Sequence, residues 1–361
     1  MNKIKIVHIA SFEDGHFSGV KSVLEELIPA QRALGHDIWI FNNKKNKRKV
    51  IDGEIYIGGF RDFVKHINEI RPDFVLFHTL YDFNKVKYSY YLRYIKIPYI
   101  IEPHGSTTSK NTQKSKIKKK IADFVYVLNY IKHSKGLIYL NKKEKDDCIF
   151  KNLRKNFAIV PNGTQLHDVD NKKRNVDVVK FIFLGRIDII PKGLDLLFSA
   201  IKLFNARYGQ NLAEFHLYGQ LRDASMQSVF EDNIKNAGSN VFFHGAVSGL
   251  EKEQAYRSSN VFVLTSRGEG MPMSVLEALS YGLPCLLSPQ TNMANLITEN
   301  KCGWVTETSE ESICETVYKA VCEYKENNSE LINNSLTAVK CFSWDSIAKE
   351  SIRAYLELLH A

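Results

Sequence analysis

The chain has 361 residues, 44% hydrophobic and 25% charged, so it is long enough for two domains of ordinary size and has a globular composition. Its net charge of +9 favours anionic partners such as nucleic acid, anionic lipid or phosphorylated substrates. No stretch approaches the roughly 20 apolar residues that span a bilayer. Residues 1–10 read as a strand rather than a secretory signal, so we expect a cytoplasmic protein.

Short β-rich runs alternate with helical patterns along the whole chain, which is typical of parallel α/β sheets covered on both faces. In the first half we expect strands at residues 4–9, 38–41, 74–78, 99–102, 136–140 and 158–160. In the second half we expect them at residues 181–184, 214–218, 241–244, 261–265 and 285–288. The polar stretch 165–177 separates the two sets and is the best linker. The pattern predicts two Rossmann-like, doubly wound domains, residues 1–164 and 165–342.

Three features of the first half point to a site at the carboxyl ends of strands, where ligands of such sheets bind. Ser18 and Gly19 lie in a loop that opens an amphipathic helix at residues 21–34. His104 follows the strand 99–102, and we expect the flanking Pro103 and Gly105 to expose its imidazole. His78 closes the strand 74–78 at an equivalent place. A structural role is the alternative reading for each of these residues.

A cationic loop follows the first strand of the second half. The strand ends at Gly185, and Arg186 and Lys192 come before the next helical segment. Arginine offers a rigid fork for phosphate oxygens and lysine a mobile point charge. Together they predict a diphosphate site that needs no metal ion.

Two carboxylates bracket the start of an apolar helix near residue 272. Pro272 suits the first helical position and Gly282 suits the stop. The helix start near Gly270 is then an anion site, because free N–H groups point outward there. Glu269 lies beside this site, and Glu277 lies further along the helix, on the side of Ser274 and Tyr281. The two carboxylates are placed to accept hydrogen bonds from two sets of hydroxyls.

Taken together, these segments resemble the family-4 retaining glycosyltransferases of the GT-B fold, whose hallmarks are a Glu-x7-Glu motif and an earlier Arg/Lys pair. Further matching segments are Pro103-His104-Gly105, Val160-Pro161-Asn162-Gly163, Phe243-His244-Gly245 and Phe342-Ser343-Trp344. The resemblance implies two domains that face each other across a cleft, with the first binding the acceptor and the second the nucleotide sugar. It also implies that the last helix, within residues 343–361, packs back on the first domain.

The resemblance also assigns roles to residues. The catalytic group comprises His104 beside the donor sugar, Arg186 and Lys192 on the diphosphate, and Glu269 on the sugar hydroxyls. Glu277 binds the nucleotide ribose. The remaining donor contacts are expected at Gly185, Val247, Gly270, Met271, Pro272, Met273, Ser274 and Val275, and the acceptor side at Ser18, Gly19 and His78.

The expected reaction transfers a sugar from a UDP- or GDP-sugar to a hydroxyl of a glycan or lipid-linked acceptor, with retention. Bacterial polysaccharide, capsule or lipopolysaccharide assembly is the expected setting. No cofactor and no metal are expected, since the DxD-like pair Asp168 and Asp170 falls in the linker. The six cysteines show no metal spacing and are expected to be reduced and mostly buried.

Three alternatives remain open from the sequence. The lysines between Lys114 and Lys120 form either a solvated face or a patch that holds the protein on an anionic membrane. A nucleotide-sugar epimerase or hydrolase on the same scaffold is the rival enzyme. A nucleic-acid binder is disfavoured, because the aromatic residues are spread over the chain and no nucleic-acid motif is present.

Overall fold

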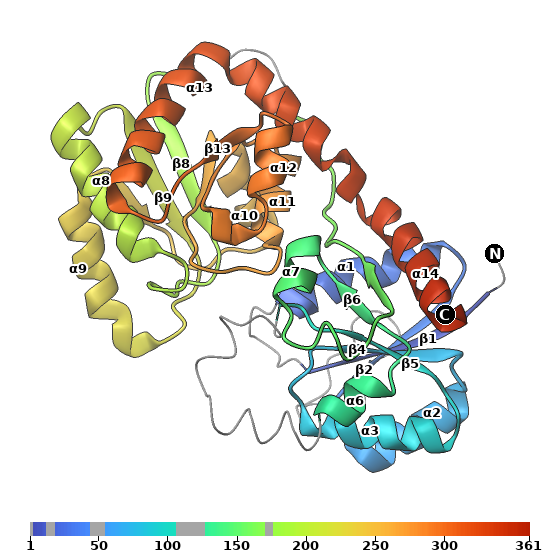
Figure 1. Cartoon of the computed structure of the whole chain (residues 1–361). Coiled ribbons are helices and arrows are strands. Elements are labelled where there is room, and N and C mark those ends of the chain that lie inside the picture. Colours follow the sequence, from blue (N-terminus) through green and yellow to red (C-terminus); the bar gives the residue numbers. More distant parts are fainter. Residues whose placement is uncertain (1–2, 12–18, 44–54, 106–126, 170–175) are drawn as a thin grey trace. The chain divides into compact units, whose positions relative to one another are not determined.

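The computed structural model describes residues 3–11, 19–43, 55–105, 127–169 and 176–361 (Figure 1). The chain divides into two compact units, each described here by itself. Unit 1 comprises Met1–Gly163 and Trp344–Ala361, and unit 2 comprises Thr164–Ser343. These boundaries lie one residue from the division that the sequence predicts.

Unit 1 contains a seven-stranded parallel sheet in the order β3-β2-β1-β4-β5-β6-β7. Central strands such as β4 are buried at every residue, as expected for a sheet with helices on both faces. The strands are β1 Lys5–Ala10, β2 Asp37–Asn42, β3 Ile55–Ile57, β4 Phe74–His78, β5 Tyr99–Glu102, β6 Leu137–Tyr139 and β7 Phe157–Ile159. The described helices are α1 Gly19–Ala33, α2 Phe60–Ile70, α3 Phe83–Tyr94, α6 Leu128–Lys132, α7 Lys142–Asp147 and α14 Trp344–His360.

Unit 2 contains a six-stranded parallel sheet in the order β10-β9-β8-β11-β12-β13. Its strands are β8 Val179–Leu184, β9 Ala213–Tyr218, β10 Val241–Phe243, β11 Val261–Leu264, β12 Cys285–Leu287 and β13 Gly303–Val305. Its α-helices are α8 Leu194–Tyr208, α9 Gln227–Ala237, α10 Gly249–Arg257, α11 Met273–Ser280, α12 Ala294–Glu299 and α13 Glu310–Val339.

The carboxy-terminal helix α14 packs on unit 1, although the long helix α13 that precedes it belongs to unit 2. Nε2 of Gln31 in α1 donates a hydrogen bond to Oγ of Ser351 in α14 at 2.9 Å. The ring of Tyr355 contacts Phe74 of β4 edge-on, with centroids 5.6 Å apart. The last helix therefore covers the amino-terminal sheet, as the resemblance implies.

Most predicted strands are confirmed, and two are new. β3 and β13 were not predicted, because each has only three residues at a sheet edge and so shows no periodicity. All six cysteines are free; Cys322 is half-buried, Cys341 is exposed and the other four are buried. No helix in the described part of the chain is long and apolar enough to cross a membrane.

Candidate active site

The loops that follow β8 and β11 in unit 2 are joined by close backbone contact and an ion pair. Gly193, just before α8, has φ +67°, and a Cβ there would lie 2.0 Å from the carbonyl oxygen of Thr265. Only glycine combines this conformation with such an approach. Arg267 reaches across with both terminal nitrogens to the Asp195 carboxylate, at 2.6 and 2.7 Å. The two loops that carry the predicted donor residues are thus held side by side.

Lys192 and Glu269, predicted separately as diphosphate and sugar contacts, form an ion pair. Nζ of Lys192 donates to Oε1 of Glu269 at 2.7 Å, and the side chains are only 18% and 15% exposed. Ser266 Oγ donates to the same carboxylate oxygen at 2.6 Å. Nδ2 of Asn292 donates to the carbonyl oxygen of Glu269 at 2.7 Å, so the backbone of this loop is also held. A ligand that binds beside these two loops would therefore contact the Lys192 ammonium and the Glu269 carboxylate in positions that are already fixed.

Arg186 is placed differently from Lys192. Gly185 continues the sheet by donating its N–H to the carbonyl oxygen of Tyr218 at 3.0 Å, and the next side chain, Arg186, is exposed. Within the described residues, Arg186 forms no ion pair or side-chain hydrogen bond. Its guanidinium is therefore available to an anion without first leaving a protein partner.

The start of α11 differs by one residue from the prediction. Pro272 is the N-cap, with ψ 121°, and the helix begins at Met273. Proline cannot supply a side-chain cap, and none is made. Among the described residues, the first turn of α11 therefore has no side-chain cap on its N–H groups. Val275 was predicted as a donor contact, but its side chain is completely buried in the core of unit 2. Side-chain contact between Val275 and a ligand is thereby excluded.

Glu277 is held by two residues of α10. Nζ of Lys252 lies 2.6 Å from Oε1 of Glu277, and Oη of Tyr256 donates to Oε2 at 2.9 Å. Oη of Tyr256 also lies 3.4 Å from the carbonyl oxygen of Ser274, and its ring stacks on Tyr281. Glu277 and Tyr281 thus both contact Tyr256, as their spacing predicts, and Glu277 keeps 21% of its side chain exposed.

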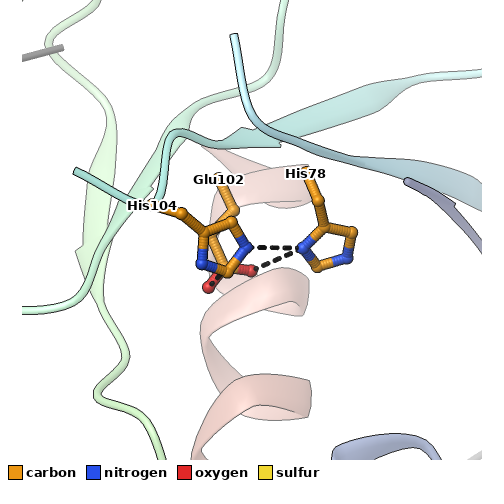
Figure 2. A group of neighbouring side chains, drawn as sticks. All are labelled: His78, Glu102 and His104. Carbon is orange, nitrogen blue, oxygen red and sulfur yellow. Dashed lines mark hydrogen bonds and ion pairs between the residues drawn. The ribbon is translucent and has the colours of Figure 1, made fainter. Parts of the chain in front are cut away.

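In unit 1, the structure brings His78 and His104 together (Figure 2). Nδ1 of His78 lies 2.8 Å from Nε2 of His104. Glu102 lies beside both, with Oε2 3.5 Å from the His78 nitrogen and Oε1 3.6 Å from the His104 nitrogen. The other nitrogen of His78, Nε2, lies 2.8 Å from Nδ1 of His8 in β1. The three histidines meet because β1, β4 and β5 are neighbours in the parallel sheet.

The expectation that the turn at Pro103–Gly105 exposes the imidazole is wrong, because only 8% of the His104 side chain is accessible. The backbone folds tightly, with φ +51° at His104, and the Gly105 N–H donates to the buried Glu144 carboxylate. Burial lowers the pKa of His104 to about 3 and raises the pKa of Glu102 to about 8. At neutral pH the imidazole is uncharged and the Glu102 carboxyl is protonated.

His78, Glu102 and His104 each place one possible ligand atom within 4.8 Å of the others, and two imidazoles with a carboxylate are a donor set that suits Zn²⁺. The ring nitrogens that would bind an ion already lie at hydrogen-bond distance from each other. Glu102 would also have to lose its proton. We therefore describe the group as a hydrogen-bonded chain and assign no metal to it.

The other predicted positions are placed as follows. Gly19 is the first residue of α1, and Val247 lies half-buried between β10 and α10. Ser18, the segment from Lys114 to Lys120, and Asp170 lie outside the described residues. Nη1 of Arg257 donates a hydrogen bond to the carbonyl oxygen of Asp168 at 3.4 Å.

Sequence reasoning missed a polar cluster at the ends of β1, β2 and β4. The Asp82 carboxylate accepts hydrogen bonds from Ser11 Oγ and Asn43 Nδ2, both at 2.7 Å. Lys85 is completely buried, and its Nζ donates to the carbonyl oxygen of His78 at 2.5 Å and to Thr79 Oγ1 at 2.8 Å. The available signal was that Ser11, Asn43 and Thr79 each directly follow a strand.

Comparison with known proteins finds a family match within unit 2. Residues 179–323 match the family model described as glycosyl transferases group 1. This group 1 region includes Arg186, Lys192, Glu269 and Glu277, whereas the histidine chain lies outside it. The whole chain shares its two-domain GT-B fold with sucrose-phosphate synthase from Thermosynechococcus elongatus, at a TM-score of 0.77 and 15% identity over 99% of this chain and 100% of that one. The predicted fold class is confirmed.

The relatives that are similar in sequence include two glycosyltransferases. An uncharacterized glycosyltransferase of Methanocaldococcus jannaschii is 24% identical over 59% of this chain and 57% of its own length. A UDP-Gal:alpha-D-GlcNAc-diphosphoundecaprenol alpha-1,3-galactosyltransferase of Escherichia coli is 28% identical over 46% of this chain and 45% of its own. The matched segments thus span about half of each relative.

Proposed function

We propose that the protein is a glycosyltransferase that moves a sugar from a nucleoside diphosphate sugar to a hydroxyl of a glycan or lipid-linked acceptor, with retention at the anomeric carbon. The observation that carries the proposal is the group 1 match over residues 179–323, which contains both loops of the donor site. The name of the E. coli relative, a galactosyltransferase that uses UDP-Gal, supports a UDP-sugar donor and a lipid-linked acceptor.

The leaving diphosphate would be stabilised by fixed charges of unit 2. Arg186 is exposed and without a side-chain partner in the described chain, Lys192 is held in place by Glu269, and the first turn of α11 offers N–H groups. Charges that are already positioned need no reorganisation while negative charge develops on the phosphate. Glu277, oriented by Lys252 and Tyr256, would accept hydrogen bonds from the ribose.

No strong base is required of the protein in this proposal. The departing phosphate would take the proton of the acceptor hydroxyl as the new bond forms on the same face of the sugar. The low pKa of His104, about 3 because of burial, makes its imidazole a poor proton acceptor and is consistent with this mechanism.

A panel of UDP-, GDP- and ADP-sugars in thermal-shift measurements tests the donor site, and acceptor-dependent release of the nucleoside diphosphate tests the transfer. Stabilisation by one donor class with release only in the presence of acceptor is expected. Donor turnover that needs no acceptor would instead assign an epimerase or hydrolase. Transfer is expected to survive EDTA, because the proposed charge stabilisation uses arginine, lysine and helix N–H groups.

We further propose a role in bacterial polysaccharide, capsule or lipopolysaccharide assembly, with the protein held at an anionic membrane by the lysines from Lys114 to Lys120. The net charge of +9 supports this placement. Sedimentation with anionic and neutral liposomes at rising salt tests it. Binding that ignores both lipid charge and salt would contradict it.

A further inference from the structure

Three histidines of unit 1 are joined by hydrogen-bond contacts that end at His104, and Gln31 lies at the far end of this row. Nε2 of Gln31 donates to Ser351 Oγ at 2.9 Å and lies 3.4 Å from Tyr355 Oη. Gln31 is a neighbour of His8, and the hydrogen-bond contacts then run from His8 to His78 at 2.8 Å and from His78 to His104 at 2.8 Å. Gln31, His8 and His78 are completely buried. This row therefore runs from α14 through the sheet to the turn after β5.

All three imidazoles are neutral at pH 7. Burial lowers the pKa of His8 and of His104 to about 3 and that of His78 well below its ordinary value. A neutral imidazole has one N–H donor and one acceptor nitrogen. Each contact between two of these histidines needs one donor and one acceptor nitrogen. The hydrogen bonds can therefore all point toward His104 or all point toward His8. The partner at either end decides between the two arrangements.

The contact between His8 and Gln31 decides the direction of these hydrogen bonds. Nε2 of His8 and Oε1 of Gln31 are both buried without a hydrogen-bond partner among the described residues. Gln31 opposes the burial that lowers the pKa of His8, as a nearby amide oxygen does, and its NH₂ group already faces Ser351 and Tyr355 of α14. A proton on Nε2 of His8 that faces this oxygen satisfies both atoms, whereas the other tautomer leaves two acceptors facing each other, which is costly in a buried site.

With a proton on Nε2 of His8, Nδ1 of His8 must accept from Nε2 of His78. Nδ1 of His78 must then accept from Nε2 of His104. The remaining nitrogen, Nδ1 of His104, carries a lone pair and has no hydrogen-bond partner in the described part of the chain. The nearby ionisable groups do not reverse this order. Lys85 is bound to the His78 carbonyl and Thr79, and Glu144 to the N–H groups of Leu140 and Gly105. The protonated Glu102 carboxyl is a donor, and it lies 3.5 Å from Nδ1 of His78, which accepts in this order.

We propose that His78 is a positioning residue that holds His104 with its proton on Nε2, so that Nδ1 accepts a hydrogen bond from a ligand hydroxyl. The identity of that hydroxyl, on the donor sugar or the acceptor, rests on the proposed glycosyltransferase function. A lone pair attracts an O–H donor and repels a phosphate oxygen. The turn at His104 thus selects the hydroxyl-bearing part of a ligand and not its diphosphate.

The tautomer can be measured on the full chain labelled with ¹⁵N-histidine, independently of any activity. In the wild type, we expect the ring of His104 to carry its proton on Nε2 between pH 6 and 8. H78F removes the acceptor nitrogen, so His104 should populate both neutral tautomers. H78Q supplies an amide oxygen in its place and should restore the proton on Nε2 of His104 in part. H216Q is the matched control, because His216 and His244 form a similar pair at 3.0 Å in unit 2. A proton on Nδ1 of His104 in the wild type, or a tautomer unchanged in H78F, would overturn the proposal.

Kinetics separate this role from a merely structural one. H78F should lower kcat for transfer about 10-fold with the donor KM unchanged within about twofold, and H78Q should recover part of the loss. Stoichiometric Zn²⁺ binding by the wild type that H78F abolishes would overturn the proposal, since the cluster would then be a metal centre. If no donor supports transfer in the wild type, the proposed function fails, while the ¹⁵N spectra still decide the tautomer.

Discussion

Nζ of Lys192 lies 2.7 Å from Oε1 of Glu269, and this contact joins the loop after β8 to the loop after β11, 77 residues later in the chain. Both side chains are more than four-fifths buried. The predicted diphosphate contact and the predicted sugar contact are therefore one unit. A change to either residue alters the position and charge of the other.

Replacing Lys192 with alanine should slow transfer more than it weakens donor binding. The lysine would act mainly on charge that develops on the leaving phosphate, so we expect kcat to fall about 100-fold with a smaller change in donor affinity. Steady-state kinetics with saturating acceptor measure this. Lys180→Ala is the matched control, since Lys180 pairs with Glu214 elsewhere in unit 2. Unchanged turnover in the Lys192 variant would contradict the electrostatic role.

Replacing Glu277 with alanine should act chiefly on donor binding. A charged carboxylate that accepts two ribose hydroxyls contributes about 1.5–3 kcal/mol per hydrogen bond, so the donor Kd should rise at least about 10-fold. Calorimetric titration with the donor that stabilises the wild type measures this. Glu253→Ala is the control, because Glu253 lies in α10 beside the residues that hold Glu277 but pairs with Arg257. Equal donor affinity in the Glu277 variant and this control would refute the ribose contact.

Gly193→Ala should destabilise the protein far more than Gly209→Ala, although both glycines flank α8 and have positive φ. At Gly193 a Cβ would meet the Thr265 carbonyl oxygen at 2.0 Å, whereas at Gly209 nothing lies within 4 Å. We expect losses of about 3 kcal/mol or more and about 1 kcal/mol, respectively. Urea denaturation followed by circular dichroism compares them. Similar losses would mean that the two loops are not in close contact.

Glu102→Gln should stabilise the protein increasingly as the pH rises from 5 to 8. Burial raises the pKa of the Glu102 carboxyl from 4.5 to about 8, so in this range the folded protein holds a proton that the unfolded chain has lost. The contribution of Glu102 to the free energy of unfolding therefore falls as the pH rises. Glutamine does not titrate, so the variant does not lose stability in this way. The difference in free energy of unfolding between variant and wild type should grow by at most about 4 kcal/mol.

Urea titrations at pH 5, 6.5 and 8 measure that difference. Glu214→Gln is the control with the opposite sign, because hydrogen bonding to His216 and the charge of Lys180 lower the pKa of Glu214. Its carboxylate stabilises the folded state above its unfolded pKa, so the variant should gain nothing as the pH rises. A flat difference for Glu102→Gln would show that its carboxyl is ionised in the folded protein.

Local sequence patterns were enough to predict the α/β class, the two-unit division and the positions of most strands. Runs such as Phe74–His78 and Tyr99–Glu102 are apolar and bounded by polar residues, so local composition is sufficient to locate them. It also placed Arg186, Lys192, Glu269 and Glu277 directly after strands or on the next helix. Position relative to a strand end is a local property of the chain.

Which of these side chains meet depends on how the strands pair in the folded protein. His8 and His78 are 70 residues apart, and they touch because β1 and β4 pair in parallel. Lys85 is buried because the His78 carbonyl and the Thr79 hydroxyl accept its hydrogen bonds, which helical periodicity does not reveal. Burial and neighbouring charges set the protonation of Glu102 and His104, and both depend on residues distant in sequence. The chemical state of the site is therefore a property of the folded sheet, although the residues that form it can be read from the chain.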